Sequence, residues 1–389
     1  MRRPGSPLSH SAILARALGI PALMGVEAQL AGLADGTLVA LDGERGRVWV
    51  QPDDAQLAEL RSRAEGWLAG REAMRASSRS PARTRDGRRV EVVANIGSLA
   101  EARLALANGA EGVGVLRTEF LFLNRPDAPT EEEQYVAYAA IAEVLGERPL
   151  TIRTLDIGGD KPLPYLVLER ESNPFLGLRG IRISLERPDL LRTQLRAILR
   201  AGAGHQVKVM FPMVSSPVEV RAARALLAEA QAELLHAGVP FAESTETGIM
   251  VEVPAVITMA DRLAGEVQFF SIGTNDLSQY LMAADRTNAR VAGLADDLQP
   301  AVLRSVYRVA QAAHAAGIWV GLCGELAGDP LAVPLLVGMG LDELSANPAA
   351  IPAVKQAIAR VTLAESQTLL AALDLDSADA VRAYLQSKA

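Results

Sequence analysis

Residues 248–255 read GIMVEVPA, and residues 269–276 read FFSIGTND. Each stretch is a short, almost continuous apolar run that ends in carboxylate or amide side chains. Such runs are typical of strands buried on both faces of a parallel sheet. In a closed parallel barrel the carboxyl ends of all strands meet at one rim. The two stretches therefore predict two buried strands with polar groups gathered at that rim.

Six further apolar runs follow the same rhythm along the chain, separated by segments with apolar residues at helical spacing, such as 216–236 and 301–316. Eight strands alternating with helices favour an α/β fold, a (β/α)8 TIM-type barrel. An open doubly wound sheet is the alternative, but no GxGxxG follows the first strand. The other six predicted strands are 90–96, 112–116, 150–155, 207–213, 318–323 and 342–346.

The chain has 389 residues, whereas such a barrel takes about 250, so we expect a smaller part beside it. Residues 1–52 predict a partial domain that is too small to bury its own core. Residues 53–89 predict a linker helix followed by a loop, and residues 90–389 the barrel, with helices at its end. Within the first part we expect a helix at 11–18, capped by Ser9, and strands at 37–41 and 47–51.

The loop at residues 79–89, RSPARTRDGRR, is rich in arginine. It could form a basic binding patch, but no aromatic residues are interleaved for stacking on bases. Pro81 and Gly87 interrupt regular structure, so the sequence favours a solvated loop between domains.

The composition, with 49% hydrophobic and 22% charged residues, is typical of a globular enzyme. A formal net charge of -7 argues against nucleic acid as a main partner. The chain has one cysteine, so it can form no internal disulfide, and a reducing compartment is expected. No apolar run approaches the roughly 20 residues of a membrane span, and Arg16 and Pro21 interrupt any signal-like segment. We therefore expect a cytoplasmic protein without a membrane partner.

Two arginines, Arg117 and Arg153, stand near the carboxyl ends of two predicted strands. A guanidinium fork binds phosphate or carboxylate with two parallel hydrogen bonds, so the pair could form an anion clamp. Alternatively, each could pair structurally with a neighbouring carboxylate such as Glu119 or Asp156. Two basic residues after the third predicted strand could join the same site: Lys161 and Arg179.

Two carboxylates, Glu252 and Asp276, follow buried apolar runs, where an unpartnered charge is costly. A hard divalent cation would satisfy both, and Mg²⁺ suits such a pair because substrate oxygens and water complete its coordination. Ion pairs with the arginines are the alternative. No cluster of histidine and cysteine argues for zinc.

Four more residues are candidates at the same rim or near the amino terminus. Asn275 could donate its amide to a substrate oxygen, and Arg286 could add a third positive group. Cys323 ends a predicted strand, and an ordinary thiol is mostly protonated at neutral pH, so it could act as an acid or a nucleophile. His10 precedes a predicted helix, whose amino terminus would stabilise an attached phosphoryl group.

Seven stretches, in this order, resemble enzyme I of the phosphoenolpyruvate:sugar phosphotransferase system over most of residues 8–350. The related pyruvate phosphate dikinase and phosphoenolpyruvate synthase are similar to it in their barrel and phosphohistidine helix, but the forms TIRTLDIGGDK and CGELAGD resemble enzyme I more. The seven stretches are LSHSAILARALGIPA, GVGVLRTEFLF, IRTLDIGGDKPLPY, NPFLGLRGIRI, GIMVEVPA, FFSIGTNDLSQYLMAADR and GLCGELAGD.

The resemblance implies a phosphoenolpyruvate-protein phosphotransferase. By that similarity, His10 accepts the phosphoryl group, Cys323 protonates the departing enolate, and Glu252 and Asp276 hold Mg²⁺. The residues implied to bind phosphoenolpyruvate are Arg117, Arg153, Asn275, Asp276 and Arg286. The resemblance also implies a histidine-containing phosphocarrier protein as partner and a homodimer formed through the barrel.

The chain departs from the family pattern at its amino-terminal end. The family usually has GGxTSH up to the histidine, whereas this chain has GSPLSH at residues 5–10. We also expect that most of the swivelling phosphohistidine domain, and the helical domain that docks the phosphocarrier, are not part of this chain. A binding and dimerisation module without turnover, or a fragment of the dikinase or synthase type, are therefore the alternative functions.

Overall fold

The structure is a computed structural model, which describes residues 21–23, 26, 30–43, 45–158, 163, 165–166, 169 and 171–388. The chain divides into two compact units, Met1–Arg79 and Ser80–Ala389. Their boundary falls within the predicted linker segment at 53–89. Each unit is described by itself.

The first unit contains a two-stranded antiparallel sheet and a long helix. Strands β1 (Val39–Asp42) and β2 (Arg47–Val50) pair antiparallel, which confirms the two strands predicted there. Helix α3 (Asp54–Ser77) begins where predicted because the Asp53 side chain accepts from the backbone N–H of Gln56, and the Gln56 side chain closes the capping box. The helix predicted at 11–18 lies outside the described residues.

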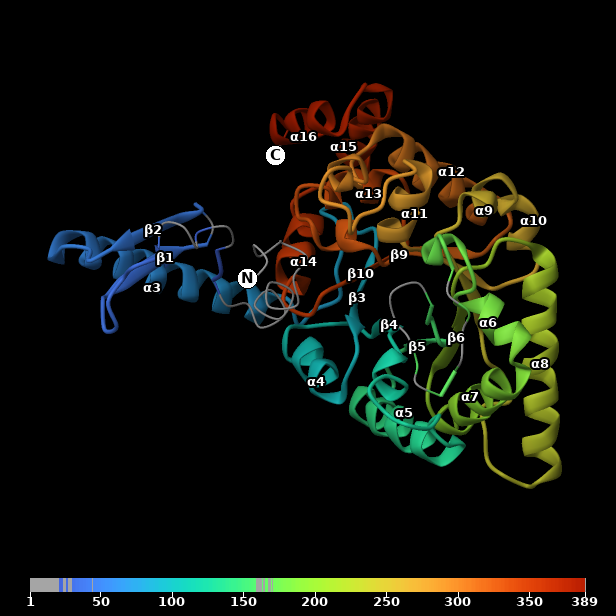
Figure 1. The fold of residues 1–389 in the computed structure, drawn as a ribbon. Coiled ribbons are helices and arrows are strands. Elements are labelled where there is room, and N and C mark those ends of the chain that lie inside the picture. The colour runs from blue at the N-terminus through green and yellow to red at the C-terminus, as the bar shows by residue number, and fades with distance from the viewer. Residues whose placement is uncertain are drawn as a thin grey trace. The chain divides into compact units, whose positions relative to one another are not determined.

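The second unit is a closed barrel of eight parallel strands, which confirms the predicted (β/α)8 fold (Figure 1). The strands pair in chain order, and β10 closes the ring by pairing with both β9 and β3. All eight fall within or next to the predicted segments. They are β3 (Glu91–Ile96), β4 (Val113–Leu116), β5 (Leu150–Arg153), β6 (Val207–Phe211), β7 (Thr247–Val251), β8 (Phe269–Ile272), β9 (Trp319–Leu322) and β10 (Glu343–Ala346).

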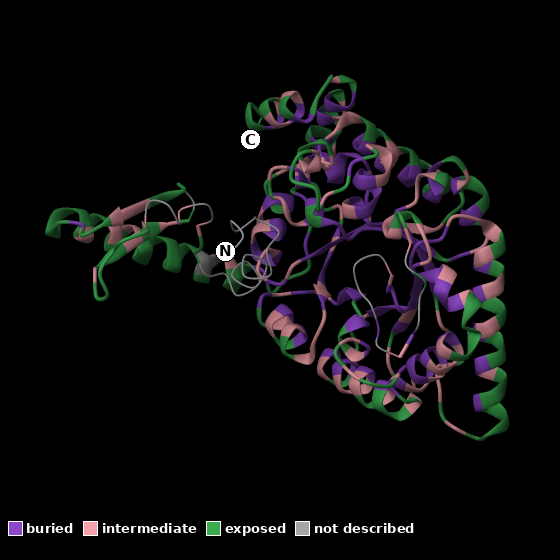
Figure 2. Ribbon diagram, in the orientation of Figure 1, coloured by how far each residue is buried: buried purple, intermediate pink, exposed green. Residues whose placement is uncertain are grey.

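Helices cover the outside of the strands and pack their apolar faces against them (Figure 2). The predicted helices at 216–236 and 301–316 are α8 and α12. The helices are α4 (Leu99–Ala107), α5 (Glu131–Leu145), α6 (Ile181–Glu186), α7 (Pro188–Ala201), α8 (Pro217–His236), α9 (Pro254–Thr258), α10 (Ala260–Ala264), α11 (Thr274–Leu281), α12 (Pro300–Ala315), α13 (Val333–Gly338), α14 (Ile351–Ala359), α15 (Leu363–Thr368) and α16 (Ala378–Gln386). Short 3-10 helices lie at Glu119–Leu121, Pro174–Leu176, Ala292–Leu294, Glu325–Gly328 and Leu369–Asp374. None of the helices in the described part of the chain combines the length and hydropathy of a membrane span.

The arginine-rich loop after α3 is irregular, as predicted, apart from one isolated bridge between Arg83 and Arg89. Several of its guanidinium groups meet carboxylates of the barrel unit. These ion pairs are Arg85–Glu365, Arg88–Asp342, Arg89–Glu91 and Arg89–Glu111. The loop charges are thus largely neutralised within the unit.

The amino-terminal end of the barrel contains a buried carboxyl group, Glu343, the first residue of β10. Its side chain is 5% exposed, and its Oε1 accepts no hydrogen bond from the described residues. Burial, opposed by Lys208 and assisted by the carboxylates of Glu91 and Asp342, raises the pKa of Glu343 to about 8. Glu343 is therefore a neutral acid at and below neutral pH.

The stability of the barrel should consequently fall as the pH rises. The pKa of Glu343 is about 8 in the folded chain against 4.5 for a free glutamate, so its contribution is complete below pH 4.5 and is lost by about pH 8. Glu343→Gln should match the wild type at pH 5 and exceed it by a few kcal/mol at pH 9, since each unit of pKa shift corresponds to about 1.4 kcal/mol. Urea unfolding at both pH values measures the difference.

Glu143→Gln, a substitution of an exposed carboxyl on α5, is the matched control and should leave the pH dependence as it is in the wild type. Equal stability of the wild type and Glu343→Gln at pH 9 would contradict a buried neutral Glu343.

Candidate functional site

Six of the predicted site residues lie at or just beyond the carboxyl ends of five strands, whereas Arg286 lies in the segment after α11. Since all strands are parallel, these positions share one rim of the barrel. Arg153 is the last residue of its strand, and the others follow within one to four residues. The positions are Arg117 after β4, Arg153 in β5, Glu252 after β7, Asn275 and Asp276 in the first turn of α11 after β8, and Cys323 after β9.

Arg153 is buried between two carboxylates. Its Nη2 donates to Glu119 Oε1 at 2.8 Å, and its Nη1 lies 3.1 Å from Asp156 Oδ2. Burial alone would lower the pKa of Arg153, but Glu119 and Asp156, and then Glu252, raise it well above its ordinary value. The structural pairing considered from the sequence is therefore present, and Arg153 is a permanent cation held below the rim.

A second buried arginine, Arg179, extends the same network. Its Nη2 contacts both oxygens of Asp156, at 3.2 and 3.1 Å, and lies 3.5 Å from Asp276 Oδ2. Its Nη1 donates to the Tyr280 hydroxyl at 3.0 Å. Asp156 thus bridges Arg153 and Arg179, and the strands β5 and β8 are joined through alternating charges.

Glu252 lies inside this network without full neutralisation. Its Oε1 accepts the backbone N–H of Met213 at 2.6 Å. Burial raises the pKa of Glu252 to about 8, the negative charges of Asp156 and Asp276 add to the effect, and Arg153 and Arg179 oppose it. Burial is thus the main reason that the ionised form of Glu252 is disfavoured, and a cation bound beside it would favour ionisation.

Asp276 is the second carboxylate at this place. Its Oδ1 accepts no hydrogen bond within the described residues, although Arg286 Nη2 lies 3.4 Å away. The ion pairs considered from the sequence as an alternative to a metal are thus present for Asp276, with both Arg179 and Arg286. They leave one carboxylate oxygen without a hydrogen-bond donor in a buried position.

These two carboxylates fit a cation that needs few protein ligands. Among the described residues, no three His, Cys, Asp or Glu side chains come together as a metal site. Mg²⁺ is commonly held by one or two carboxylates, and the buried Glu252 together with the open oxygen of Asp276 suits it.

The thiol of Cys323 is buried and protonated. Its Sγ donates to the carbonyl of Ile272 at 3.5 Å, and its backbone N–H donates to the same carbonyl at 2.9 Å. Burial raises the pKa of the thiol to about 11, which the neighbouring Ser271 hydroxyl offsets only in part. Of the two roles left open by the sequence, this environment favours an acid over a nucleophile.

Asn275 has its amide oriented by the chain segment after Cys323. Its Oδ1 accepts the backbone N–H of Glu325 at 2.8 Å, so its Nδ2 is the end that can donate to a ligand. Arg117 is exposed at the rim, and Arg286 is half-buried. Arg117 and the Asn275 amide can therefore reach a ligand without first breaking a buried ion pair, whereas Arg286 is paired with Asp276.

Two predicted residues, His10 and Lys161, lie outside the described residues. Two others were missed by the sequence reasoning. Tyr280, in α11, contacts Arg179, and only its place one turn after Asp276 could have indicated this. Asn95 contacts the Cys323 carbonyl, and the signal was an amide near the end of an otherwise apolar strand.

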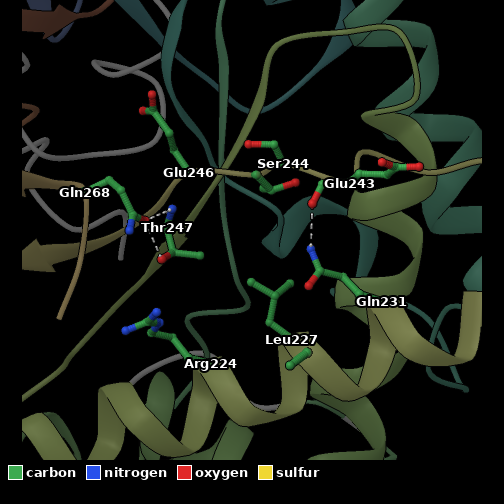
Figure 3. Close-up of a pocket in the computed structure, with 10 residues that line it drawn as sticks. Arg224, Leu227, Gln231, Glu243, Ser244, Glu246, Thr247 and Gln268 are labelled. Carbon is green, nitrogen blue, oxygen red and sulfur yellow. Dashed lines mark hydrogen bonds between the residues drawn. The ribbon is translucent and has the colours of Figure 1, made fainter. Parts of the chain in front are cut away.

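A pocket of about 410 Å³ lies elsewhere, between α8 and the segment that enters β7 (Figure 3). Arg224, Leu227 and Gln231 of α8 face residues 243–247 across it. It lies beside the amino end of β7, opposite the rim described above. A second pocket, of about 610 Å³, lies among α13, α14, α15 and α16. Neither pocket contains a predicted site residue.

Two family models match the chain. The model described as PEP-utilising enzyme, PEP-binding domain, matches residues 71–363, and the model described as PEP-utilising enzyme, mobile domain, matches residues 3–46. The chain belongs to the PEP-utilising enzymes. The first match covers the described rim residues, and the second covers the position of His10.

Curated relatives in this family carry the function implied by the motifs. The chain is 46% identical to a phosphoenolpyruvate-protein phosphotransferase of Geobacillus stearothermophilus over 98% of this chain and 66% of that protein. It is 49% identical to that of Bacillus sp. (strain S) over 89% of this chain and 60% of that protein. A multiphosphoryl transfer protein of Rhodobacter capsulatus is 49% identical over 94% of this chain and 43% of that protein.

The resemblance to enzyme I is thereby confirmed, and the chain spans less than two thirds of the length of each of these three relatives. Among solved structures, a citrate lyase from Burkholderia xenovorans matches 79% of this chain and 91% of that chain, with 19% identity and a TM-score of 0.44. This likeness is too distant to bear on function.

Arg153→Met should destabilise the barrel by about 3–5 kcal/mol, because it leaves Glu119 and Asp156 as buried carboxylates without their shared cation. Arg117→Met, at the equivalent place of the preceding strand but exposed, should change stability by less than about 0.5 kcal/mol. Denaturant unfolding at pH 7 measures both. Similar small effects of the two substitutions would show that Arg153 is not a structural cation.

Proposed function

We propose that this chain binds phosphoenolpyruvate at the rim of the barrel and, with Mg²⁺, transfers its phosphoryl group to His10 and releases pyruvate. The phosphoryl group would then pass to a histidine-containing phosphocarrier protein. The observation that carries the proposal is that arginines, two buried carboxylates and a protonated thiol lie at one rim. The names of the curated relatives support the same reaction.

Phosphoenolpyruvate presents a carboxylate and a phosphate on a three-carbon enol, and the rim offers groups suited to each. Arg117 and Arg286 are the cations with the most accessible forks, and guanidinium groups bind such oxyanions with paired hydrogen bonds. Asn275 would add a directed amide. Arg153 is committed to Glu119 and Asp156, so it would act mainly through its fixed positive charge.

Glu252 and Asp276 would hold Mg²⁺. When bound, the cation would neutralise charge on the phosphoryl group as it leaves the enol oxygen. A bound cation would favour the ionised form of Glu252, which burial disfavours. Arg179 and Arg286, both paired with Asp276, keep that carboxylate turned toward the rim.

Cys323 would complete the reaction by protonation. As the bond between phosphorus and the enol oxygen breaks, the electron pair stays with the enolate. The thiol then gives its proton to the terminal carbon, a new C–H bond forms, and pyruvate results. A thiol with a pKa of about 11 is protonated at neutral pH and therefore ready for this step.

His10 would be the phosphoryl acceptor within residues 1–52, a partial swivelling domain, with residues 53–89 as linker and 90–389 as the barrel. Further parts of this proposal are a homodimer formed through the barrel and a cytoplasmic location. The chain spans less than two thirds of the length of these relatives.

The central test is transfer of label. Incubating the chain with [32P]phosphoenolpyruvate and Mg²⁺ should label it in an acid-labile form and release pyruvate in equal amount. His10→Ala should remove the label, and Cys323→Ala should slow pyruvate release by about 10²–10⁴-fold, as for loss of a general acid. Phosphoenolpyruvate binding without label or pyruvate would instead support a binding module without turnover.

The dependence of phosphoenolpyruvate binding on Mg²⁺ provides a second test, which does not involve His10. Calorimetry should show that Mg²⁺ strengthens phosphoenolpyruvate binding to the wild type. In Glu252→Gln and Asp276→Asn this gain should vanish, because the cation loses half of its protein ligands. Glu325→Gln, an exposed carboxyl near the same rim, is the control and should keep the gain. An undiminished Mg²⁺ effect in both site variants would contradict the proposed ligands.

A further inference from the structure

The carbonyl of Cys323 lies beyond the end of a strand ladder. Strands β9 and β10 pair only at Gly321 with Glu343 and Leu322 with Leu344, whereas β10 continues to pair with β3 up to Ala346. The peptide that follows Leu322 is therefore not held by the neighbouring strand β10. A buried carbonyl at such a place needs another donor.

Asn95 of β3 supplies that donor by reaching across β10. Its Nδ2 donates to the carbonyl of Cys323 at 2.9 Å and to the carbonyl of Ser345 at 2.9 Å. The Ser345 hydroxyl donates to Asn95 Oδ1 at 2.7 Å. Both donor hydrogens of the amide and its oxygen are thus used, which defines a single orientation of the side chain.

The other side of the Cys323 segment is also held. The Cys323 N–H donates to the carbonyl of Ile272 at 2.9 Å, and Asn275 accepts the N–H of Glu325. Between them, Gly324 packs so tightly on Thr274 that an added Cβ would lie 1.9 Å from its Oγ1. The Thr274 hydroxyl in turn donates to Asp297 at 2.7 Å. The segment has no room to shift toward α11.

We propose that Asn95 is a positioning residue for the thiol of Cys323, acting through the Cys323 carbonyl and locked in place by the Ser345 hydroxyl. Without the amide, the Cys323 carbonyl loses its donor on the side of β10, and the thiol is no longer fixed on the line along which it meets the substrate carbon. Asn95 touches no substrate atom in this arrangement. Its loss should therefore affect proton transfer and leave ligand binding unchanged.

This inference rests on the proposed role of Cys323 as proton donor, and one reaction tests the two separately. The chain is incubated with pyruvate and Mg²⁺ in D2O, and the methyl signal is followed by proton NMR. In each exchange the small fraction of the protein with Cys323 as thiolate takes a proton from the methyl carbon, and the electron pair of the broken C–H bond moves into the enolate. The S–H group then exchanges its proton for a deuteron of D2O, and the thiol gives this deuteron to the enolate carbon, which restores pyruvate and the thiolate. The difference between wild type and Cys323→Ala is the exchange due to the thiol.

Asn95→Ala should lower that exchange by about 10²-fold, as expected for a small misplacement of a reacting group. Ser345→Ala, which removes only the bond that locks the amide, should cause a smaller loss, on the order of fivefold. Phosphoenolpyruvate binding by calorimetry should stay within about twofold of the wild type in both variants, since neither residue touches the ligand.

Asn108→Ala is the matched control. Asn108 also donates its Nδ2 to a buried carbonyl, that of Pro348, at 2.9 Å, and it likewise ties the segment after β3 to the segment after β10. It lies away from Cys323, so its loss should reduce thermal stability but keep the exchange rate.

The outcomes separate the two proposals. Wild-type exchange equal to that of Cys323→Ala would defeat the role of Cys323 and the role of Asn95 with it. If the wild type shows clear exchange and folded Asn95→Ala or Ser345→Ala keeps it, the positioning role alone is overturned. The positioning role is also overturned if Asn108→Ala loses exchange to the same extent, or if the loss of exchange comes with an equal loss of phosphoenolpyruvate binding. If Asn95→Ala fails to fold, Ser345→Ala decides.

Discussion

A buried chain of alternating charges determines how the carboxyl rim of this barrel is built. Asp156 lies between Arg153 and Arg179, and Arg179 continues to Asp276. Each group would be costly to bury alone, and each is acceptable only because its neighbour has the opposite sign. This series of charged side chains joins β5 to the start of α11. The other features of the rim, including the charge around Glu252, depend on this arrangement.

The charged groups of the rim divide into buried ones and accessible ones. Glu252 receives one backbone hydrogen bond, and its pKa is raised first by burial and then by two neighbouring carboxylates. The exposed cation Arg117 stands at the rim, and among the described residues it is not part of the buried series Arg153, Asp156, Arg179 and Asp276. The buried charges thus hold the scaffold, while the accessible ones are left for a ligand. Cys323 belongs to neither group, because its surroundings are apolar and its orientation comes from backbone contacts and from Asn95.

Much of the fold could be predicted because each strand of the barrel is buried on both faces and therefore reads as an uninterrupted apolar run. The strand β7, with Glu252 just after it, is the clearest example. Short helices such as α9 and α10 were not predicted, since five residues carry too little periodicity to be recognised. Asp276 and Glu252 were predicted as neighbours, but the pairing of Arg153 with Glu119 was only one of two alternatives. The partner of a long side chain depends on the distance between strands. The spacing of residues along the sequence does not give this distance.

By itself, the sequence determined the order of strands and helices, the residue types at each strand end and, through its motifs, the family. These follow from local patterns, because strands buried on both faces appear as apolar runs in the sequence, and helices appear between them as apolar residues at helical spacing. Only the tertiary structure decided which charges neutralise one another, which end of the Asn275 amide faces outward, and that Asn95 reaches Cys323 over an intervening strand. Those outcomes depend on ring closure, which brings β10 between β9 and β3 and places residues more than two hundred positions apart within hydrogen-bonding distance.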